Sequence, residues 1–216
     1  MAALKKYDLS GKEIGTVEIE DARLEIKASS QSIKDYLVAI RNNARQWSAH
    51  TKTRAEIART GRKPHPQKGM GRSRQGDLAA PHYKGGGIVF GPRKKDIHTR
   101  INQKEKRAAI RFILTEKIKA NQIHILAKEQ MKEPKTKQLA SFFKELKIAD
   151  RRILVLGEHK KEMTKSRQNL VKSLRNIPKK EYGLLTQLNG YSLARCRELI
   201  VLESALDEFL SILGVS

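Results

Sequence analysis

Short apolar blocks recur along residues 101–216, and several of them contain no polar interruption. The runs at 153–157 and 199–202 are uninterrupted, which is typical of strands covered on both faces of a sheet. The shorter blocks at 123–127 and 180–185 have the length and flanking residues of two further strands. The second half of the chain is therefore predicted to contain a sheet with a largely buried centre.

Between these blocks, apolar residues are spaced three and four positions apart, which predicts amphipathic helices. This spacing covers residues 102–119, 135–147, 162–174 and 204–213. Ser204 is placed to cap the last of these helices, because a serine hydroxyl accepts a hydrogen bond from a free N–H group of the first turn.

The first 45 residues continue the same organisation. Residues 4–8 and 15–19 predict a short antiparallel strand pair, and 32–45 predicts a helix whose apolar positions are Ile33, Leu37, Val38 and Ile40. Strands that alternate with helices, with roughly 20 to 30 residues in each strand–helix unit, imply right-handed crossovers. The predicted fold is therefore α/β, with a mainly parallel sheet flanked by helices in a Rossmann-like topology, formed as one globular domain by residues 1–41 and 101–216.

Residues 42–100 break this pattern and are predicted to form a long extended basic loop, inserted near the N-terminal third of the chain. Residues 52–100 hold 13 Lys or Arg but three acids, together with eight of the 14 glycines and four of the six prolines. Ordering such a segment costs roughly 1–2 kcal/mol of backbone entropy per residue, and there is little apolar surface to offset that cost. We expect disorder in the free protein and one path along a polyanion that binds it.

The whole chain carries a formal charge of +22 in 216 residues, which favours a nucleic-acid partner. A membrane partner is disfavoured because no apolar run approaches the roughly 20 residues that span a bilayer. The single cysteine, Cys196, excludes an intramolecular disulfide and a Cys-rich zinc site, and it fits a reduced cytoplasmic compartment. His50, His65, His82 and His98 lack metal-ligand spacing, so neither a metal nor a cofactor is predicted.

Two glycine motifs of the loop do not support a nucleotide-binding enzyme. Gly71 and Gly76 have the spacing of a phosphate-binding loop, but Asp77 stands where that loop needs lysine. The Gly85, Gly86 and Gly87 triplet lacks the dinucleotide-binding fingerprint. Glycine instead lets a backbone lie directly against phosphate or ribose. The alternative is a flexible linker, although a linker would favour Ser and Gly without so many charges and prolines.

The basic residues of the loop recur without helical or heptad spacing, as suits an extended chain that passes among many phosphates. If six to ten such contacts form, a rise from low to moderate salt should lower the affinity for duplex DNA roughly 10³–10⁵-fold, and the affinity for single strands somewhat less. The predicted RNA-binding residues are Lys52, Arg54, Arg59, Arg62, Lys63, Lys68, Arg72, Arg74, Lys84, Gly85, Gly86, Gly87, Arg93, Lys94, Lys95 and Arg100.

Three segments carry a resemblance to a known family. They are TRAE at 53–56, RKPHPQKGMGRSRQG at 62–76 and APHYKGGGIVFGP at 80–92, and NQKEKRAAIR at 102–111 and AKEQMKEPKTK at 127–137 extend the match. Together they resemble the universal L-four family of large-subunit ribosomal proteins, in its bacterial form.

The resemblance implies a non-catalytic constituent of the large subunit, ribosome-bound in the cytoplasm, that binds several ribosomal RNA domains early in assembly. It implies a globular domain on the solvent side and a loop that penetrates the RNA. The loop tip would form the constriction of the nascent-peptide exit tunnel with a neighbouring ribosomal protein, and no homo-oligomer is expected. By resemblance, the tip comprises Lys63, Pro64, His65, Pro66, Gln67, Lys68 and Gly69; the family usually has Trp-Arg in place of His65-Pro66.

Two other classes of function compete with this interpretation. A Rossmann-like RNA-modifying enzyme would need a cofactor fingerprint at a strand end, and the sequence has none. A basic architectural protein would bind duplex DNA as well as ribosomal RNA at matched salt.

Overall fold

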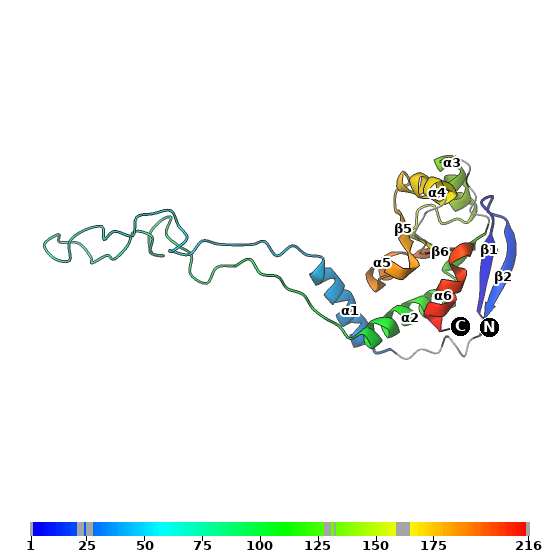
Figure 1. Cartoon of the computed structure of the whole chain (residues 1–216), viewed down its shortest axis with the longest axis horizontal. Coiled ribbons are helices and arrows are strands. Elements are labelled where there is room, and N and C mark those ends of the chain that lie inside the picture. Colours follow the sequence, from blue (N-terminus) through cyan, green and yellow to red (C-terminus); the bar gives the residue numbers. More distant parts are fainter. Residues whose placement is uncertain are drawn as a thin grey trace. The chain divides into compact units, whose positions relative to one another are not determined.

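The structure is a computed structural model that describes residues 2–20, 24, 28–127, 131, 133–158 and 165–214. It divides into two compact units (Figure 1). The globular unit comprises Met1–Arg41 and Arg100–Ser216, and the arm unit comprises Asn42–Thr99.

The regular elements of the chain alternate between strands and helices from residue 103 onward. In chain order they are β1 Ala2–Tyr7, β2 Glu13–Ile19, α1 Ser30–Asn43, α2 Gln103–Lys119, β3 Ile123–Leu126, α3 Thr136–Glu145, β4 Ile153–Gly157, α4 Lys165–Arg175, β5 Lys180–Leu184, α5 Gly190–Arg195, β6 Glu198–Leu202 and α6 Leu206–Leu213, with short 3₁₀ turns at Leu185–Gln187 and Glu203–Ala205.

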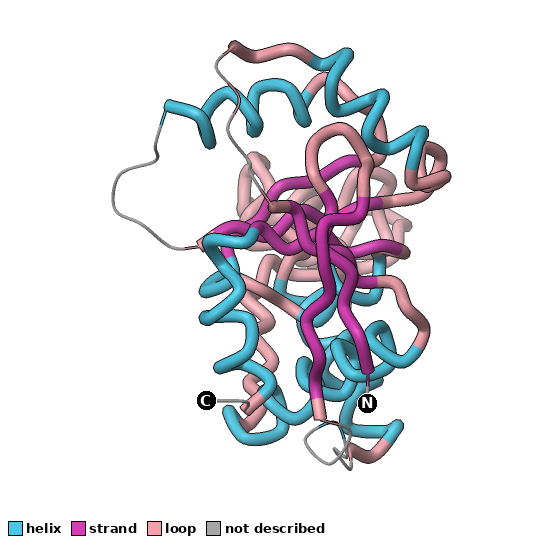
Figure 2. Tube along the Cα trace, turned by 90° about the vertical axis from the view of Figure 1, so that its right-hand side faces the viewer, coloured by secondary structure: helices cyan, strands magenta, loops and turns pink. Residues whose placement is uncertain are grey.

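Six strands form one sheet in the order β2-β1-β3-β6-β4-β5. The β1–β2 pair is antiparallel, and the four other pairs are parallel. Helices lie on both sides of the strands (Figure 2). Every residue of β4 and of β6 is buried, so the centre of the sheet is the centre of the core. The mixed α/β class is confirmed, and the Rossmann-like topology stays a prediction.

Two local features of this unit differ from the sequence prediction. The short helix α5 was not predicted; Asn189 caps it by accepting a hydrogen bond from the backbone N–H of Ser192 at 2.7 Å. The prediction that Ser204 caps the last helix is wrong, because α6 begins after a 3₁₀ turn and its N-cap position is Ala205. The Ser204 hydroxyl instead accepts a hydrogen bond from buried Arg167 at 3.0 Å. The start of the helix predicted at 162–174 lies outside the described residues.

The helix α1, which leads into the arm unit, is anchored to α5 within the globular unit. The hydroxyl of Tyr36 accepts a hydrogen bond from the backbone N–H of Gly190 at 3.1 Å, and burial raises the pKa of this hydroxyl. A Cβ atom at Gly190 would lie 2.4 Å from the Tyr36 ring, so glycine is required for the contact.

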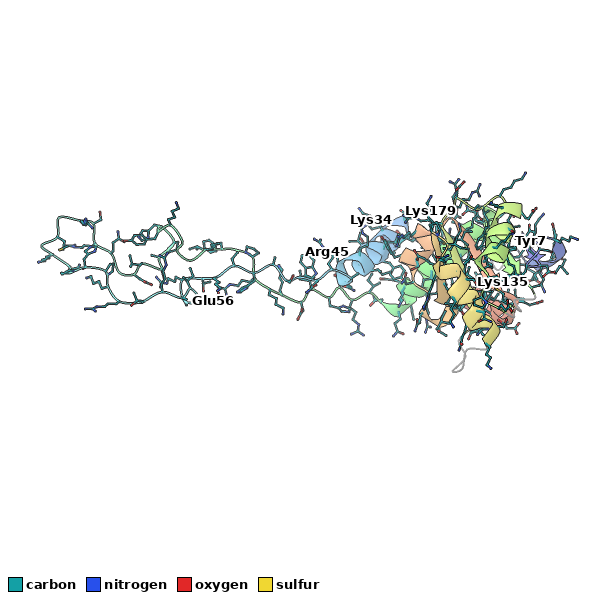
Figure 3. The ribbon with its side chains drawn as sticks, turned by 90° about the horizontal axis from the view of Figure 1, so that it is seen from above. Tyr7, Lys34, Arg45, Glu56, Lys135 and Lys179 are labelled. Carbon is teal, nitrogen blue, oxygen red and sulfur yellow. The ribbon has the colours of Figure 1, made fainter. Side chains whose placement is uncertain are left out.

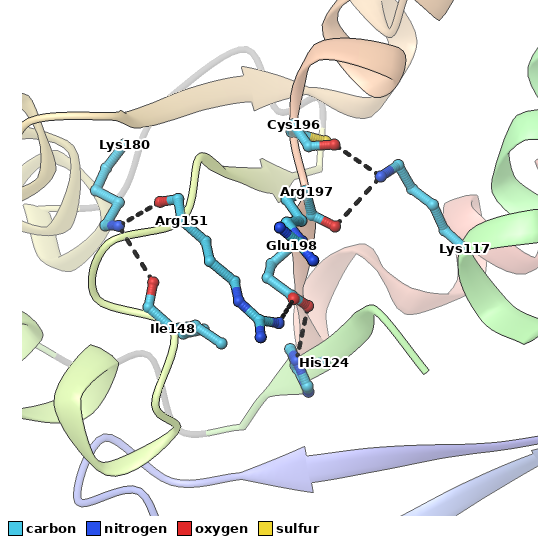
Figure 4. A network of polar contacts seen from close by, with 8 residues as sticks. All are labelled: Lys117, His124, Ile148, Arg151, Lys180, Cys196, Arg197 and Glu198. Atoms are coloured by element: carbon cyan, nitrogen blue, oxygen red, sulfur yellow. Dashed lines mark hydrogen bonds and ion pairs between the residues drawn. The ribbon is translucent and has the colours of Figure 1, made fainter. Parts of the chain in front are cut away.

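Buried charges cluster where β6 begins (Figure 4). The carboxylate of Glu198 is almost fully buried, and it pairs with Arg151 and lies 3.3 Å from Nε2 of His124. Burial lowers the pKa of His124, an effect that Glu198 partly opposes. The β6 strand can therefore begin with a buried charged residue because that charge is paired with the partly exposed guanidinium of Arg151.

Two buried lysines tie other elements to the same region. Lys117 of α2 donates to the backbone oxygen of Cys196 at 2.8 Å, two residues before β6 begins. Lys180 of β5 donates to the backbone oxygens of Ala149 at 2.6 Å and Arg151 at 2.7 Å. In this position a lysine satisfies carbonyl groups that would otherwise be buried without a donor.

Candidate nucleic-acid interface

Residues 44–99 of the arm unit, all of which the structure describes, contain no helix or strand. We call residues 44–62 the outgoing limb, 63–75 the distal end and 76–99 the returning limb. Hydrogen bonds between the limbs are nested in sequence, so the chain goes out and returns beside itself, as Figure 1 shows.

The base of the arm is closed by a two-way amide pair. The side chain of Asn43 donates to the backbone oxygen of Thr99 at 3.0 Å and accepts from its backbone N–H at 2.8 Å. An asparagine side chain thus replaces a strand partner, because its amide presents one donor and one acceptor side by side.

A second set of bonds joins the limbs farther out. The backbone N–H of Thr51 donates to the oxygen of Pro92 at 2.9 Å, and that of Ile88 donates to the oxygen of Lys52 at 3.0 Å. Between these two bonds the returning limb makes a short excursion, residues 89–91, whose ends are both held by the outgoing limb.

The glycine triplet lies where the arm contacts itself most closely. A Cβ atom at Gly87 would lie 2.2 Å from the backbone nitrogen of Arg54, and one at Gly86 would lie 2.0 Å from the oxygen of Ala80. The N–H of Gly87 donates to the oxygen of Ala79, which is 4% exposed. These glycines are therefore required by the arm's own packing, a reason that the sequence prediction did not include.

Arg59 connects both limbs through its side chain. Its guanidinium donates to the backbone oxygens of Leu78 at 2.8 Å and Lys84 at 3.3 Å. Gly85 has a positive φ of 78° and lies directly against this guanidinium. Arg59 was predicted as a phosphate contact, and the structure gives it an internal bridging role as well.

The outgoing limb makes a tight turn at residues 53–56. The backbone N–H of Thr53 donates to the Glu56 carboxylate at 3.0 Å, and the N–H of Glu56 donates to the oxygen of Thr53 at 3.0 Å. The bond from Thr53, followed by the charges of His50 and Arg93, lowers the pKa of Glu56. One of the few acids in the arm is thus used to hold a turn.

The distal end contains the predicted tunnel tip. Nε2 of His65 lies 3.1 Å from the backbone oxygen of Ser73, and Lys63 donates to the side chain of Gln67. Gly69 and Gly71 both have positive φ, which glycine adopts without steric cost. Apart from the partly buried His65, every residue of 63–69 is exposed.

Every lysine and arginine in the predicted RNA-binding set is exposed. Side chains project outward along both limbs (Figure 3). The structure brings Arg59, Lys84 and Gly85 together, and it places Arg54, Gly87 and Arg93 around one hollow. The other cations of the set are distributed along the arm, except Arg100, which belongs to the globular unit. The arm is thus a cationic surface supported by backbone hydrogen bonds.

Trp47 packs near the base of the arm. The guanidinium carbon of Arg45 lies 4.6 Å from the centre of the Trp47 ring, a cation–π contact. The indole lines a small hollow of about 260 Å³ together with Lys94, Ile97 and His98.

Among the residues that the structure describes, no group of three or more His, Cys, Asp or Glu side chains could hold a metal ion. No described helix is long and apolar enough to cross a membrane. Cys196 is buried, its thiol donates to the backbone oxygen of Leu193 at 3.2 Å, and burial raises its pKa. A thiol in that environment is a packing group rather than a nucleophile.

Comparison with known proteins identifies relatives of nearly the same length. Residues 17–211 match the family described as "Ribosomal protein L4/L1 family". "Large ribosomal subunit protein uL4" of Lachnospira eligens is 34% identical over 208 residues, which cover 96% of this chain and 97% of the relative. The proteins of the same name are 36% identical over 94% of this chain and 95% of the relative in Mycoplasma mycoides, and 31% identical over 99% and 100% in Symbiobacterium thermophilum. The family resemblance inferred from the sequence motifs is confirmed.

Proposed function

This chain belongs to the ribosomal protein L4/L1 family, and from that premise we propose that it is a structural, non-catalytic protein of the large ribosomal subunit whose arm binds ribosomal RNA. The observation that carries the proposal is the arm itself. It combines an exposed cationic surface with a narrow, internally bonded backbone that could pass between RNA helices.

The distribution of charge supports RNA as the partner. The arm has 13 Lys or Arg in residues 52–100, and of its three acids Glu56 and Asp77 accept backbone N–H groups of the arm, from Thr53 and Ala79. Since folded RNA is recognised largely through shape, phosphates and 2′-hydroxyl groups, exposed cations on an irregular backbone suit it better than a base-reading helix would.

We further propose that the tip of the distal end, residues 63–69, lies at the polypeptide exit tunnel beside a neighbouring ribosomal protein and contacts the nascent chain. The support is the family and the exposure of this segment, whose turns rest on Gly69, Gly71 and the bond from His65 to Ser73. Binding to several RNA domains early in assembly, in the cytoplasm, belongs to the same proposal.

The test is the salt dependence of binding to large-subunit ribosomal RNA. Replacing Arg72 and Arg74 with alanine should weaken binding and reduce the slope of log K against log salt by about one for each lost phosphate contact. Removing two exposed cations of the globular unit, Lys12 and Lys172, gives a matched control with the same change of charge and should leave the slope nearly unchanged.

An unchanged slope in the Arg72 and Arg74 double variant would contradict the arm as the phosphate-binding element. Equal affinity of the wild-type chain for duplex DNA and ribosomal RNA at matched salt would favour the architectural alternative instead. Cross-linking of ribosome-bound protein to a nascent chain through Lys68 tests the tunnel proposal independently.

A further inference from the structure

The returning limb exposes a strip of large apolar side chains in the middle of a cationic segment. Ile88 is 52% exposed, Val89 is 54% exposed and Phe90 is fully exposed. Three such side chains in water lack the stabilising free energy that burial would give them, and this free energy is largest for the aromatic ring. A contiguous exposed apolar patch of this kind marks an interaction site.

The backbone holds Phe90 in an unusual conformation. Its φ is 56°, in the left-handed region that bulky residues rarely adopt. Strain of this kind persists only where the surrounding structure imposes it, and it is concentrated at binding sites.

The surrounding contacts explain how the conformation is imposed. Thr51 bonds the returning limb after Phe90, through the oxygen of Pro92, and Lys52 bonds it before, through the N–H of Ile88. Gly91 is pressed against the outgoing limb, since a Cβ atom there would lie 2.0 Å from Oγ1 of Thr51. With both ends of the excursion held, the ring is directed into solvent rather than folded onto the arm.

Beside this strip lies a hollow of about 470 Å³ that offers two kinds of chemistry. Ile88, Val89 and Phe90 supply apolar surface, and Arg54 and Arg93 line the same hollow with cations. A nucleotide combines these features, because its base has an apolar face and its phosphates are anionic. An apolar protein surface would leave the two guanidinium groups without a counterpart.

We propose that Phe90 stacks on an unpaired nucleobase of the bound RNA, with Arg54 and Arg93 holding the phosphates beside that nucleotide. The inference rests on the proposed function and adds a specific contact to it. The scarcity of aromatic residues argues against a platform for many bases, whereas one ring held outward suits a single bulged or unstacked base.

The test compares Phe90→Ala, Phe90→Leu and Phe90→Trp in the full chain, with affinity for large-subunit ribosomal RNA as the measurement. Alanine should weaken binding roughly 5- to 150-fold, the range for loss of one base–aromatic stack. Leucine should weaken it similarly because it lacks a π face, and tryptophan should preserve it. The salt slope should stay unchanged in all three, whereas Arg54→Ala should lower it by about one.

A leucine variant that binds like wild type would overturn the inference, because an apolar contact, with a neighbouring protein for example, would then be sufficient. An alanine variant with full affinity would overturn it as well. Because Phe90 lies outside the core, thermal unfolding followed by circular dichroism should be the same for every variant.

A fluorescence measurement addresses stacking directly. Trp47 is the only tryptophan, so the double variant Trp47→Phe, Phe90→Trp reports from position 90 alone, with Trp47→Phe as the control. The emission of the tryptophan at position 90 in the double variant should be quenched when ribosomal RNA binds. Emission that does not change on saturation with RNA counts against stacking. If the wild-type chain shows no preference for ribosomal RNA over duplex DNA, the proposed function fails; if it does and Phe90→Ala has no effect, this inference alone fails.

Discussion

The backbone nitrogen of Arg54 occupies the space that a side chain at Gly87 would need, 2.2 Å from where its Cβ atom would lie. The two residues belong to opposite limbs of the arm, and their contact leaves no room for even a methyl group. The position of Arg54, and hence of its exposed side chain, therefore depends on a glycine 33 positions away in the sequence.

We expect Gly87→Ala to weaken binding to large-subunit ribosomal RNA. The added methyl group has to push the limbs apart, and overpacking of this kind costs roughly 1–3 kcal/mol, which corresponds to about 5- to 150-fold in affinity if RNA binds the paired limbs. Titration of the full chain with the RNA at one salt concentration measures the effect.

Gly76→Ala is the matched control, because no atom lies within 4 Å of the Cβ position there and no positive φ restricts it. This variant should bind like wild type. Equal losses in the two variants would mean that the arm simply tolerates no alanine, and the contact between Gly87 and Arg54 would lose its significance.

Replacement of Arg59 should weaken RNA binding even when the new residue is lysine. Arg59→Lys keeps the positive charge but cannot bridge the oxygens of Leu78 and Lys84 with one planar group. We expect a loss of roughly 1–2 kcal/mol in RNA binding, or about 5- to 30-fold, with the salt slope unchanged. Binding isotherms at several salt concentrations provide both quantities.

Arg62→Lys serves as the comparison, since Arg62 is exposed in the same limb and no side-chain hydrogen bond of its guanidinium is seen among the described residues. It should behave nearly as wild type. Should lysine be tolerated equally at both positions, Arg59 would act only through its charge.

His124 should make the stability of the globular unit depend on pH. Burial lowers its pKa in the folded protein from the ordinary value of 6.5, and Lys5 and Arg151 lower it further against the opposing effect of Glu198. The folded protein therefore keeps the ring neutral at a pH at which the unfolded chain already binds a proton. This stabilisation is present above 6.5 and is lost as the pH falls through the folded pKa.

Chemical unfolding of wild type and His124→Gln at about pH 7.5 and about pH 5.5 measures this dependence. The free energy of unfolding should fall more in wild type than in the variant, because groups that titrate in both proteins cancel in the difference. A steeper fall in the variant would show that the Glu198 carboxylate, rather than burial, dominates the environment of the ring.

The sequence predicted the globular unit well where one short-range pattern decided the structure. The uninterrupted apolar run at 153–157 became β4 with the predicted bounds. The prediction for Ser204 failed because a 3₁₀ turn precedes α6 and moves its N-cap to Ala205, which leaves the Ser204 hydroxyl to accept a hydrogen bond from distant Arg167. The helix α5 was missed because its six residues begin with glycine, although Asn189 followed by Ser192 is a capping signal that could have indicated it.

The candidate interface was likewise predictable from the sequence only in part. Its charge and glycine content are properties of the sequence, and the exposure of the cations agrees with them. The bridging role of Arg59 depends on residues 19 and 25 positions later, and the outward direction of Phe90 depends on bonds to Thr51 and Lys52. Such pairings between limbs have no local signature, so only the three-dimensional structure could reveal them.

The amide pair of Asn43 and Thr99 brings together two residues 56 positions apart and closes the arm at its base. The entropy of closing a loop grows only logarithmically with its length, by about 0.6 kcal/mol for each doubling. Insertions or deletions in the arm, between Asn43 and Thr99, would thus change the folding free energy of the globular unit only slightly. The length of the arm can therefore change at little cost to the stability of the sheet.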